Sequence, residues 1–157
     1  EKLIEQIDRI LRRDKDISWT IANSRRTPEI FSQLVETRLK RKVVYWSDVD
    51  NDWLENELAQ CGSTWVTPDS ISMVYEALTT QGRVGIFDMN PLGGGGKVSS
   101  SIDRLVKAGR LGRSSLGSLL QQLETFEPLQ ESHRCAQHII DTWFKKSKSG
   151  YVNRTTA

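Results

Sequence analysis

Two adjacent arginines stand in a short polar stretch that is well suited to bind an anion. Arg25 and Arg26 follow Ser24, come after a predicted strand over residues 17–22, and lie directly before a Thr-Pro pair. Thr before Pro indicates a helix start, because Thr can cap a helix and Pro fits its first turn. Guanidinium groups beside the free N–H groups of a helix start are typical of phosphate sites. The residues alone favour an anion site and a plain solvated turn about equally.

A second polar stretch separates a predicted strand from a predicted helix. Residues 63–66 are β-branched and aromatic, as in strands, and Pro68 ends the strand because proline has no N–H group to donate. Asp69 or Ser70 can cap the helix that follows. The free N–H groups and the dipole at that helix start favour a diphosphate. Further along the helix, Glu76 could accept hydrogen bonds from a ribose, although an ordinary surface carboxylate is the commoner role.

A run of glycines over residues 93–96, followed by Lys97, is similar to a phosphate-binding loop but does not match the P-loop pattern. Val98 stands where a Ser or Thr would hold magnesium, and Pro91 interrupts the start of the motif. ATP hydrolysis of the Walker type is therefore not expected. A loop that closes over a ligand and a plain flexible linker both stay open as interpretations.

Metal and nucleophile chemistry find little support in the residue pattern. His133 and His138 are not paired with a cysteine at metal spacing, because Cys135 between them points to a different helix face. Asp48 and Asp50 have the spacing of an Asp-x-Asp metal motif, but they lie in a loop after a predicted strand and are interpreted as surface charge. We predict no metal site and no cofactor. No Ser-His-Asp arrangement is found either, so the catalytic residues stay unknown.

Composition predicts one folded domain. The chain has 157 residues, of which 37% are hydrophobic and 27% charged, so it can bury a core. A net charge of +2 gives no reason to expect a nucleic-acid partner. Absence of a long apolar run and of a visible signal peptide, together with two cysteines, predicts a cytoplasmic protein. The basic residues at 145–148 leave peripheral contact with the inner membrane as the weaker alternative.

Helical and strand patterns alternate along the chain. Strands are predicted at residues 17–22, 43–46, 63–66 and 83–88, with a short one near 111. Helices are predicted over the first dozen residues, over 28–39, 53–58, 71–78, 98–106 (stopped by Gly109) and 116–123, and from Pro128, which opens the last long helix. This alternation predicts an α/β Rossmann-like three-layer sandwich with a mostly parallel sheet, whose ligands sit at the carboxyl ends of the strands. We expect a single domain over residues 1–150 and a flexible basic tail over 151–157. The last helix is expected to bury the stripe Ala136, Ile139, Ile140, Trp143 and Phe144.

Two motifs resemble the mitochondrial fission ELM family, which has been related to glycosyltransferases. One is the Val-Thr-Pro-Asp-Ser-Ile-Ser-Met-Val-Tyr-Glu-Ala stretch that starts at Val66, and the other is Ser-Arg-Arg-Thr-Pro from Ser24. Pro128 and Leu129 before the final helix are also similar to the family pattern. The likeness extends from about residue 17 to residue 144. A more distant likeness is to the peptidoglycan N-acetylglucosaminyltransferase.

The resemblance implies a GT-B architecture, in which this chain is the C-terminal, donor-binding half and an N-terminal acceptor-binding domain lies outside it. The chain would bind a nucleotide-diphosphate sugar for an inverting, metal-independent transferase, with the general base in the other domain. Diphosphate contacts, a ribose contact from Glu76 and sugar contacts near the glycine run would form the donor site. The implied donor-binding residues are Ser24, Arg25, Arg26, Asp69, Ser70, Ser72, Met73, Glu76, Asn90, Gly94, Gly95 and Lys97.

Two other functions stay open. The first is a non-catalytic protein-interaction module that keeps the half-fold but has lost transfer chemistry, which fits a family named for organelle fission. The second is an unrelated nucleotide-binding regulator of the same fold class, because fold alone does not fix function. Binding of a nucleotide diphosphate separates the donor domain from the interaction module.

Overall fold

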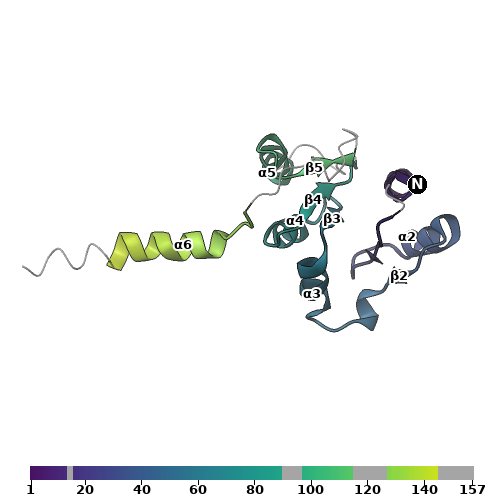
Figure 1. Cartoon of the computed structure of the whole chain (residues 1–157), viewed down its shortest axis with the longest axis horizontal. Coiled ribbons are helices and arrows are strands. Elements are labelled where there is room, and N and C mark those ends of the chain that lie inside the picture. Colours follow the sequence, from purple (N-terminus) through teal and green to yellow (C-terminus); the bar gives the residue numbers. More distant parts are fainter. Residues whose placement is uncertain (14–15, 90–96, 115–126, 145–157) are drawn as a thin grey trace, which may run out of the picture. The chain divides into compact units, whose positions relative to one another are not determined.

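A computed structural model describes residues 1–13, 16–89, 97–114 and 127–144, and the chain divides into two compact units, Glu1–Glu127 and Pro128–Ala157 (Figure 1). The domain boundary predicted at residue 150, the tail over 151–157 and the helix predicted over 116–123 lie outside the described residues. They stay predictions.

In the first unit, helices alternate with short parallel strands, which confirms the predicted α/β Rossmann-like fold class. The first half contains α1 (Lys2–Arg13), β1 (Ile21–Ala22), α2 (Glu29–Leu34) with a π-helix (Val35–Leu39), β2 (Val43–Val44) and a 3-10 helix (Trp46–Asp48). The second half contains α3 (Trp53–Gln60), β3 (Ser63–Val66), α4 (Ile71–Leu78), β4 (Arg83–Ile86), α5 (Lys97–Lys107) and β5 (Gly112–Arg113).

The strands form two small parallel sheets, β1–β2 and β3–β4–β5. β1 and β2 are shorter than predicted, with Ile21 opposite Val43 and Ala22 opposite Val44. β2 ends early because the N–H group of Trp46 donates to a side chain, the Oδ1 atom of Asn23, at 2.9 Å, and a 3-10 turn follows. The predicted strands at 63–66 and 83–88 are confirmed as β3 and as β4 with a shorter carboxyl end.

Helix α1 packs against residues from both sheets and joins them in one hydrophobic core. Its residues Ile7, Ile10 and Leu11 form a buried cluster with Phe87, which follows β4. Half-buried side chains from α1, from β1 and the residues before it, from α2 and its π-helix, and from β3 complete this cluster: Leu3, Trp19, Ile21, Phe31, Leu39 and Trp65. The helix predicted from the apolar spacing of residues 3–11 is thus confirmed, and its apolar face is what holds the β1 and β3–β4 regions together.

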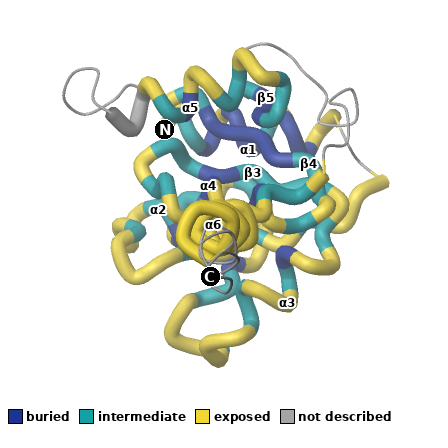
Figure 2. The backbone as a smooth tube through the Cα atoms, turned by 90° about the vertical axis from the view of Figure 1, so that its left-hand side faces the viewer, coloured by how far each residue is buried: buried dark blue, intermediate teal, exposed yellow. Residues whose placement is uncertain are grey.

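The β3–β4–β5 sheet is covered on both faces. Trp65 lies opposite Gly85, which has no side chain, and its ring packs against Phe87 at 5.5 Å between centroids on the face that meets α1. Side chains alternate along a strand, so Val66 and Ile86 point to the other face. Helix α4 contacts β3 and β4, and its buried residues are Val74, Ala77 and Leu78. Figure 2 shows the buried backbone concentrated along β4 and its neighbours.

Gly82 lies where the chain enters β4, against the end of α3. A Cβ atom added at Gly82 would lie 2.6 Å from the carbonyl oxygen of Cys61, a distance that real Cβ atoms do not adopt. The neighbouring N–H group of Arg83 donates to the carbonyl of Gly62 at 3.0 Å, so this backbone is held in place.

We expect Gly82→Ala to lower the free energy of unfolding by about 1–3 kcal/mol, because the Cys61 backbone must shift to make room. Gly62→Ala is the matched control, since a Cβ atom there meets nothing within 4 Å. Urea denaturation of both variants measures the difference. Equal stability of the two would contradict the steric explanation.

The second unit contains α6 (Glu131–Ile139) and a π-helix (Ile140–Phe144). The prediction that this helix buries an apolar stripe is wrong: Ala136 is exposed, and Ile139, Ile140, Trp143 and Phe144 are 50%, 45%, 73% and 66% exposed. The helix also begins at Glu131 and not at Pro128. Helical spacing reveals an apolar face, but it does not say which element covers that face.

Candidate functional site

Polar turns follow the carboxyl ends of the parallel strands, where ligands bind in folds of this class. The turn after β1 closes on itself through Ser24 and Thr27. The Ser24 N–H group donates to the Thr27 hydroxyl at 2.8 Å, and the Thr27 N–H group donates to the Ser24 carbonyl at 2.9 Å. The Arg26 N–H group donates to the Ser24 hydroxyl at 3.3 Å. The polar turn predicted here is confirmed, but Thr27 does not cap α2, because its hydroxyl is used within the turn.

The side chains of this turn are available to a ligand. Ser24, Arg25 and Arg26 are exposed. Neither guanidinium group makes an ion pair or hydrogen bond with the part of the chain that the structure describes. Two unneutralised positive charges on a backbone that is fixed by its own hydrogen bonds can hold an anion without first breaking an internal contact.

Asn23 ties the turn to its surroundings. Its backbone N–H group donates to the Val44 carbonyl at 3.1 Å, and its side-chain amide donates to the Ser32 hydroxyl at 3.3 Å. The same side chain accepts the Trp46 N–H group at 2.9 Å. Ser32 is only 2% exposed, so one end of this network is anchored in the interior. These hydrogen bonds therefore hold the Ser24 turn in place relative to β2 and α2.

The start of α4 leaves its backbone N–H groups open. Ser70 is the N-cap residue with φ −111° and ψ 80°, and no side chain of the described residues caps the helix, so the predicted cap by Asp69 or Ser70 does not form. The first helical bond runs from the Val74 N–H group to the Ser70 carbonyl at 3.2 Å. The N–H groups of Ser72 and Met73 precede this bond in the first turn. They have the chemistry that an anion needs.

Helix α4 presents a polar side opposite its buried face. Ser72, Tyr75 and Glu76 are exposed, whereas Met73 is half-buried. Ser72 and Glu76 are four residues apart and therefore lie on the same side of the helix. The Glu76 carboxylate makes no ion pair or hydrogen bond with the described residues, so it could accept hydrogen bonds from a ligand.

The predicted donor-binding residues lie in separate segments that are not bonded to one another in the described part of the chain. Within the described ranges, no hydrogen bond or ion pair links the turn at 24–26 with the start of α4. Asn90, Gly94 and Gly95 lie outside the described residues, and Lys97 is described only as the first residue of α5. Their roles as ligands stay predictions.

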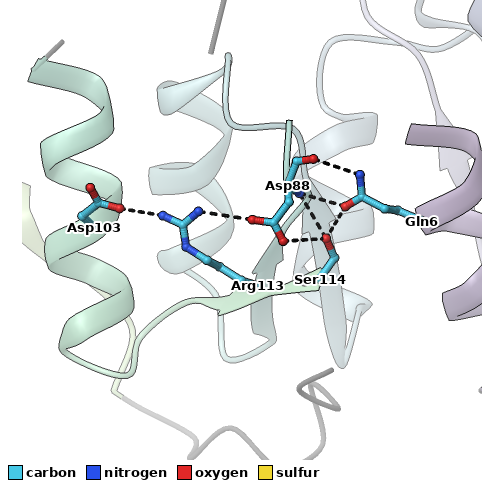
Figure 3. Close-up of polar contacts among 5 residues, drawn as sticks. All are labelled: Gln6, Asp88, Asp103, Arg113 and Ser114. Atoms are coloured by element: carbon cyan, nitrogen blue, oxygen red, sulfur yellow. Dashed lines mark hydrogen bonds and ion pairs between the residues drawn. The ribbon is translucent and has the colours of Figure 1, made fainter. Parts of the chain in front are cut away.

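A network that sequence reasoning missed joins the carboxyl ends of β4 and β5 to α1 (Figure 3). The Gln6 amide donates to the Asp88 carbonyl at 3.0 Å and accepts the Asp88 N–H group at 2.8 Å. The Ser114 hydroxyl accepts the same N–H group at 3.1 Å. It lies within hydrogen-bond distance of both Gln6 Oε1 and Asp88 Oδ2, and its single proton serves one of them at a time. We call Gln6, Asp88 and Ser114 the latch.

Arg113 extends the latch to α5 (Figure 3). Its guanidinium group lies 3.3 Å from Asp88 Oδ1 and 2.6 Å from Asp103 Oδ1. Two carboxylates already neutralise this arginine, and Asp88 is itself occupied. This end of the sheet is therefore a structural junction, whereas Arg25 and Arg26 make no ion pair with the described residues.

Gln6 carried a signal that could have revealed the latch. It stands among apolar residues at helical spacing, between Leu3 and Ile10 on the face of α1 that packs inward. Its exposure is only 6%. A buried polar side chain needs hydrogen-bond partners, so a glutamine on an apolar face predicts a specific polar contact.

The described residues contain neither a cluster that could bind a metal ion nor an activated form of the Cys61 thiol. No group of three or more His, Cys, Asp or Glu side chains there could hold a metal ion. Burial, with a smaller effect of the Glu57 carboxylate, raises the pKa of the Cys61 thiol. A raised pKa leaves less thiolate at neutral pH, so Cys61 is a poor nucleophile. No helix among the residues described combines the length and apolar character needed to cross a bilayer.

Comparison with known proteins agrees with the two sequence motifs. The family model for mitochondrial fission ELM1 matches residues 1–143, which includes the Ser24 turn, the α4 region and α6. No curated protein and no solved structure matches the chain. Because the match covers most of its length, the chain belongs to the mitochondrial fission ELM1 family.

Proposed function

We propose that this chain is the donor-binding domain of an inverting, metal-independent glycosyltransferase with GT-B architecture. It holds a nucleotide-diphosphate sugar at the carboxyl ends of its parallel strands. An N-terminal domain binds the acceptor and supplies the general base, so no residue of this chain is assigned as the base. Family membership and the parallel α/β fold support this proposal, and it agrees with what the motif resemblance implies.

One observation carries the proposal: Arg25 and Arg26 extend from a hydrogen-bonded turn at the end of β1 and have no partner among the described residues. Arginine binds phosphate oxygens in bidentate fashion, and its charge does not titrate in the physiological range. A diphosphate is the group in a nucleotide sugar that needs this charge.

The start of α4 supplies the second set of contacts. Backbone N–H groups of Ser72 and Met73 are not used by a cap, and the helix dipole adds a partial positive charge there. Glu76, on the exposed side of the same helix, accepts hydrogen bonds from the ribose hydroxyls. Asp69 and Ser70 border this set, and the residues near Lys97 contact the sugar.

The reaction is a direct displacement at the anomeric carbon of the sugar. An acceptor oxygen forms the new bond while the bond from the anomeric carbon to the diphosphate oxygen breaks, and the base of the other domain takes the acceptor proton. Negative charge builds up on the departing diphosphate. Guanidinium groups stabilise that charge, which lowers the barrier most when they are already oriented before the reaction.

Arg25→Ala is expected to weaken the binding of a nucleoside diphosphate roughly 10- to 100-fold, because a hydrogen bond between charged groups contributes about 1.5–3 kcal/mol. Isothermal titration against UDP, GDP and ADP measures the affinity, and a rise in melting temperature with ligand provides an independent check. Arg12→Ala is the control, since Arg12 is an exposed arginine on α1 that pairs with Asp8.

Glu76→Ala should weaken the binding of a nucleoside diphosphate. It should leave the binding of inorganic pyrophosphate unchanged, because pyrophosphate has no ribose. Wild-type affinity in both Arg25→Ala and Glu76→Ala would place the ligand elsewhere. Failure of the unaltered chain to bind any nucleoside diphosphate or pyrophosphate would remove the support for a donor site in this chain.

The exposed apolar residues at the end of α6 and in the π-helix that follows it favour a second candidate function, a non-catalytic protein-interaction module. Ile139, Ile140, Trp143 and Phe144 lie on an exposed helical segment, and such side chains are enriched at protein interfaces. A module of this kind would bind no nucleotide. Its partner binding would be lost in Trp143→Asp and retained in Arg25→Ala.

A further inference from the structure

Trp46, whose side chain is exposed, follows β2 beside the chain segment that leads from β1 into the arginine turn. Ala22 lies opposite Val44 in the parallel register, and the Asn23 N–H group continues the ladder to the Val44 carbonyl at 3.1 Å. Ser24 and Trp46 each stand two residues after the last paired residue of their strand. Neighbouring strands are about 4.8 Å apart, so the two segments emerge side by side.

The contact through Asn23 fixes this arrangement. Its Oδ1 atom accepts the Trp46 N–H group at 2.9 Å, and its own backbone leads directly into Ser24 and Arg25. One side chain therefore sets where the backbone of Trp46 lies relative to the arginine turn. The anchor in buried Ser32 limits movement of both.

Trp46 differs from the other tryptophans of the first unit. Trp19, Trp53 and Trp65 are half-buried, and Trp19 and Trp65 pack on the α1 cluster. The side chain of Trp46 is 50% exposed. Among the described residues, Trp46 belongs neither to the α1 cluster with Phe87 nor to a second buried cluster formed by Ile4, Val35 and Val43.

We propose that Trp46 is the base-binding residue of the donor site: the heteroaromatic base of a nucleoside diphosphate stacks on its indole while Arg25 and Arg26 hold the diphosphate. This inference rests on the proposed function and adds to it the subsite that recognises the nucleoside. In a nucleotide, a ribose separates the base from the diphosphate. Adjacent aromatic and cationic groups on neighbouring chain segments match that order.

The stacking surface predicts broad tolerance for the base. Every nucleobase has a π-face, so an exposed indole binds purines and pyrimidines alike, and a base–aromatic stack typically changes affinity by about 10-fold or more. The indole adds nothing to the binding of inorganic pyrophosphate. Comparing the two ligands therefore isolates the contribution of Trp46 from that of the arginines.

The test is isothermal titration of the full chain and its variants with UDP, GDP, ADP and inorganic pyrophosphate. Trp46→Ala is expected to lower the affinity for all three nucleoside diphosphates by about 10-fold or more. Its affinity for pyrophosphate should stay within about 2-fold of that of the unaltered chain. Trp46→Phe, which keeps an aromatic face, should recover most of the lost affinity. Trp143→Ala is the matched control, because Trp143 is an exposed tryptophan in the second unit. Thermal unfolding of each variant confirms that it is folded.

The outcomes separate the two proposals. Wild-type affinity for nucleoside diphosphates in Trp46→Ala, with affinity lost in Arg25→Ala, would overturn the base-binding role and leave the donor site standing. Nucleoside diphosphates that bind the unaltered chain no more tightly than pyrophosphate would also overturn it. An unaltered chain that binds neither ligand class would overturn the donor site and, with it, the role of Trp46.

Discussion

Replacing Ile86 by Ala is expected to lower the free energy of unfolding by about 2–5 kcal/mol. Ile86 is 1% exposed and lies in β4, the central strand of the three-stranded sheet, opposite Val66 in β3 and Arg113 in β5. Its side chain points to the face that α4 covers, where Val74 and Ala77 are fully buried. Removing it leaves a cavity that β-strands held on both sides cannot close. Urea denaturation, with the slope checked for two-state behaviour, measures the loss.

Ile30→Ala is the matched control for this substitution. Ile30 lies in α2 and is 58% exposed, so the same change of side chain removes little buried surface. A change within about 0.5 kcal/mol is expected there. A similar loss in both variants would show that burial at Ile86 does not determine its contribution.

Gln6→Leu is expected to cost about 2–3 kcal/mol of stability, although leucine is apolar and fits a helix. The substitution removes both hydrogen bonds between the Gln6 amide and the Asp88 backbone, at 3.0 and 2.8 Å, and the contact with Ser114. Each hydrogen bond contributes about 1 kcal/mol net, and polar groups left in a half-buried site add a desolvation penalty. Thermal and urea unfolding measure the loss.

Gln33→Leu tests whether the latch is responsible. Gln33 is an exposed helical glutamine whose amide donates only to Glu29, at 3.3 Å, among the described residues. Its replacement should change stability by less than about 0.5 kcal/mol. Ser114→Ala should lower stability as well, because it removes the same contacts from the β5 side. A Gln6→Leu variant that is as stable as Gln33→Leu would show that the latch does not stabilise the fold.

The latch also bears on where a ligand can bind. The side chains of the latch contact one another at the carboxyl ends of β4 and β5. Arg113, at the same place, is paired with Asp88 of the latch and with Asp103 of α5. Among the described residues, the open polar groups lie instead at the turn after β1 and at the start of α4. The donor site that we propose uses these open groups, whereas the latch holds the sheet that carries α4.

Local patterns in the sequence were sufficient for several elements. The strand at 63–66 and the helix at 71–78 match β3 and α4, because β-branched residues, a proline and an apolar helical stripe follow one another within a few positions. Gly109 ends the α5 region with φ 73°, as expected for a glycine after a helix. The Ser24 turn was also predictable, since its hydrogen bonds join residues three apart or fewer.

Other features depended on contacts between distant residues. Gln6 meets Asp88 82 positions away and Ser114 108 positions away, so no local pattern reveals their pairing. The extent of β2 depended on Asn23, which takes the Trp46 N–H group from a position 23 residues earlier. The exposed apolar face of α6 and the π-helix after it is a further case, because the spacing of Ile139, Trp143 and Phe144 does not indicate which element covers that face.

By itself, the sequence determined the α/β alternation, the family and the candidate anion-binding turn. These depend on residue types and short spacings, which act through backbone preferences and side-chain periodicity. Only the tertiary structure decided that Arg25 and Arg26 have no partner among the described residues, that the Trp46 backbone is bonded to Asn23 next to their turn, and that Asp88 is held in the latch. The physical reason is that a charge or an aromatic ring is open to a ligand only when the folded chain places no other group against it.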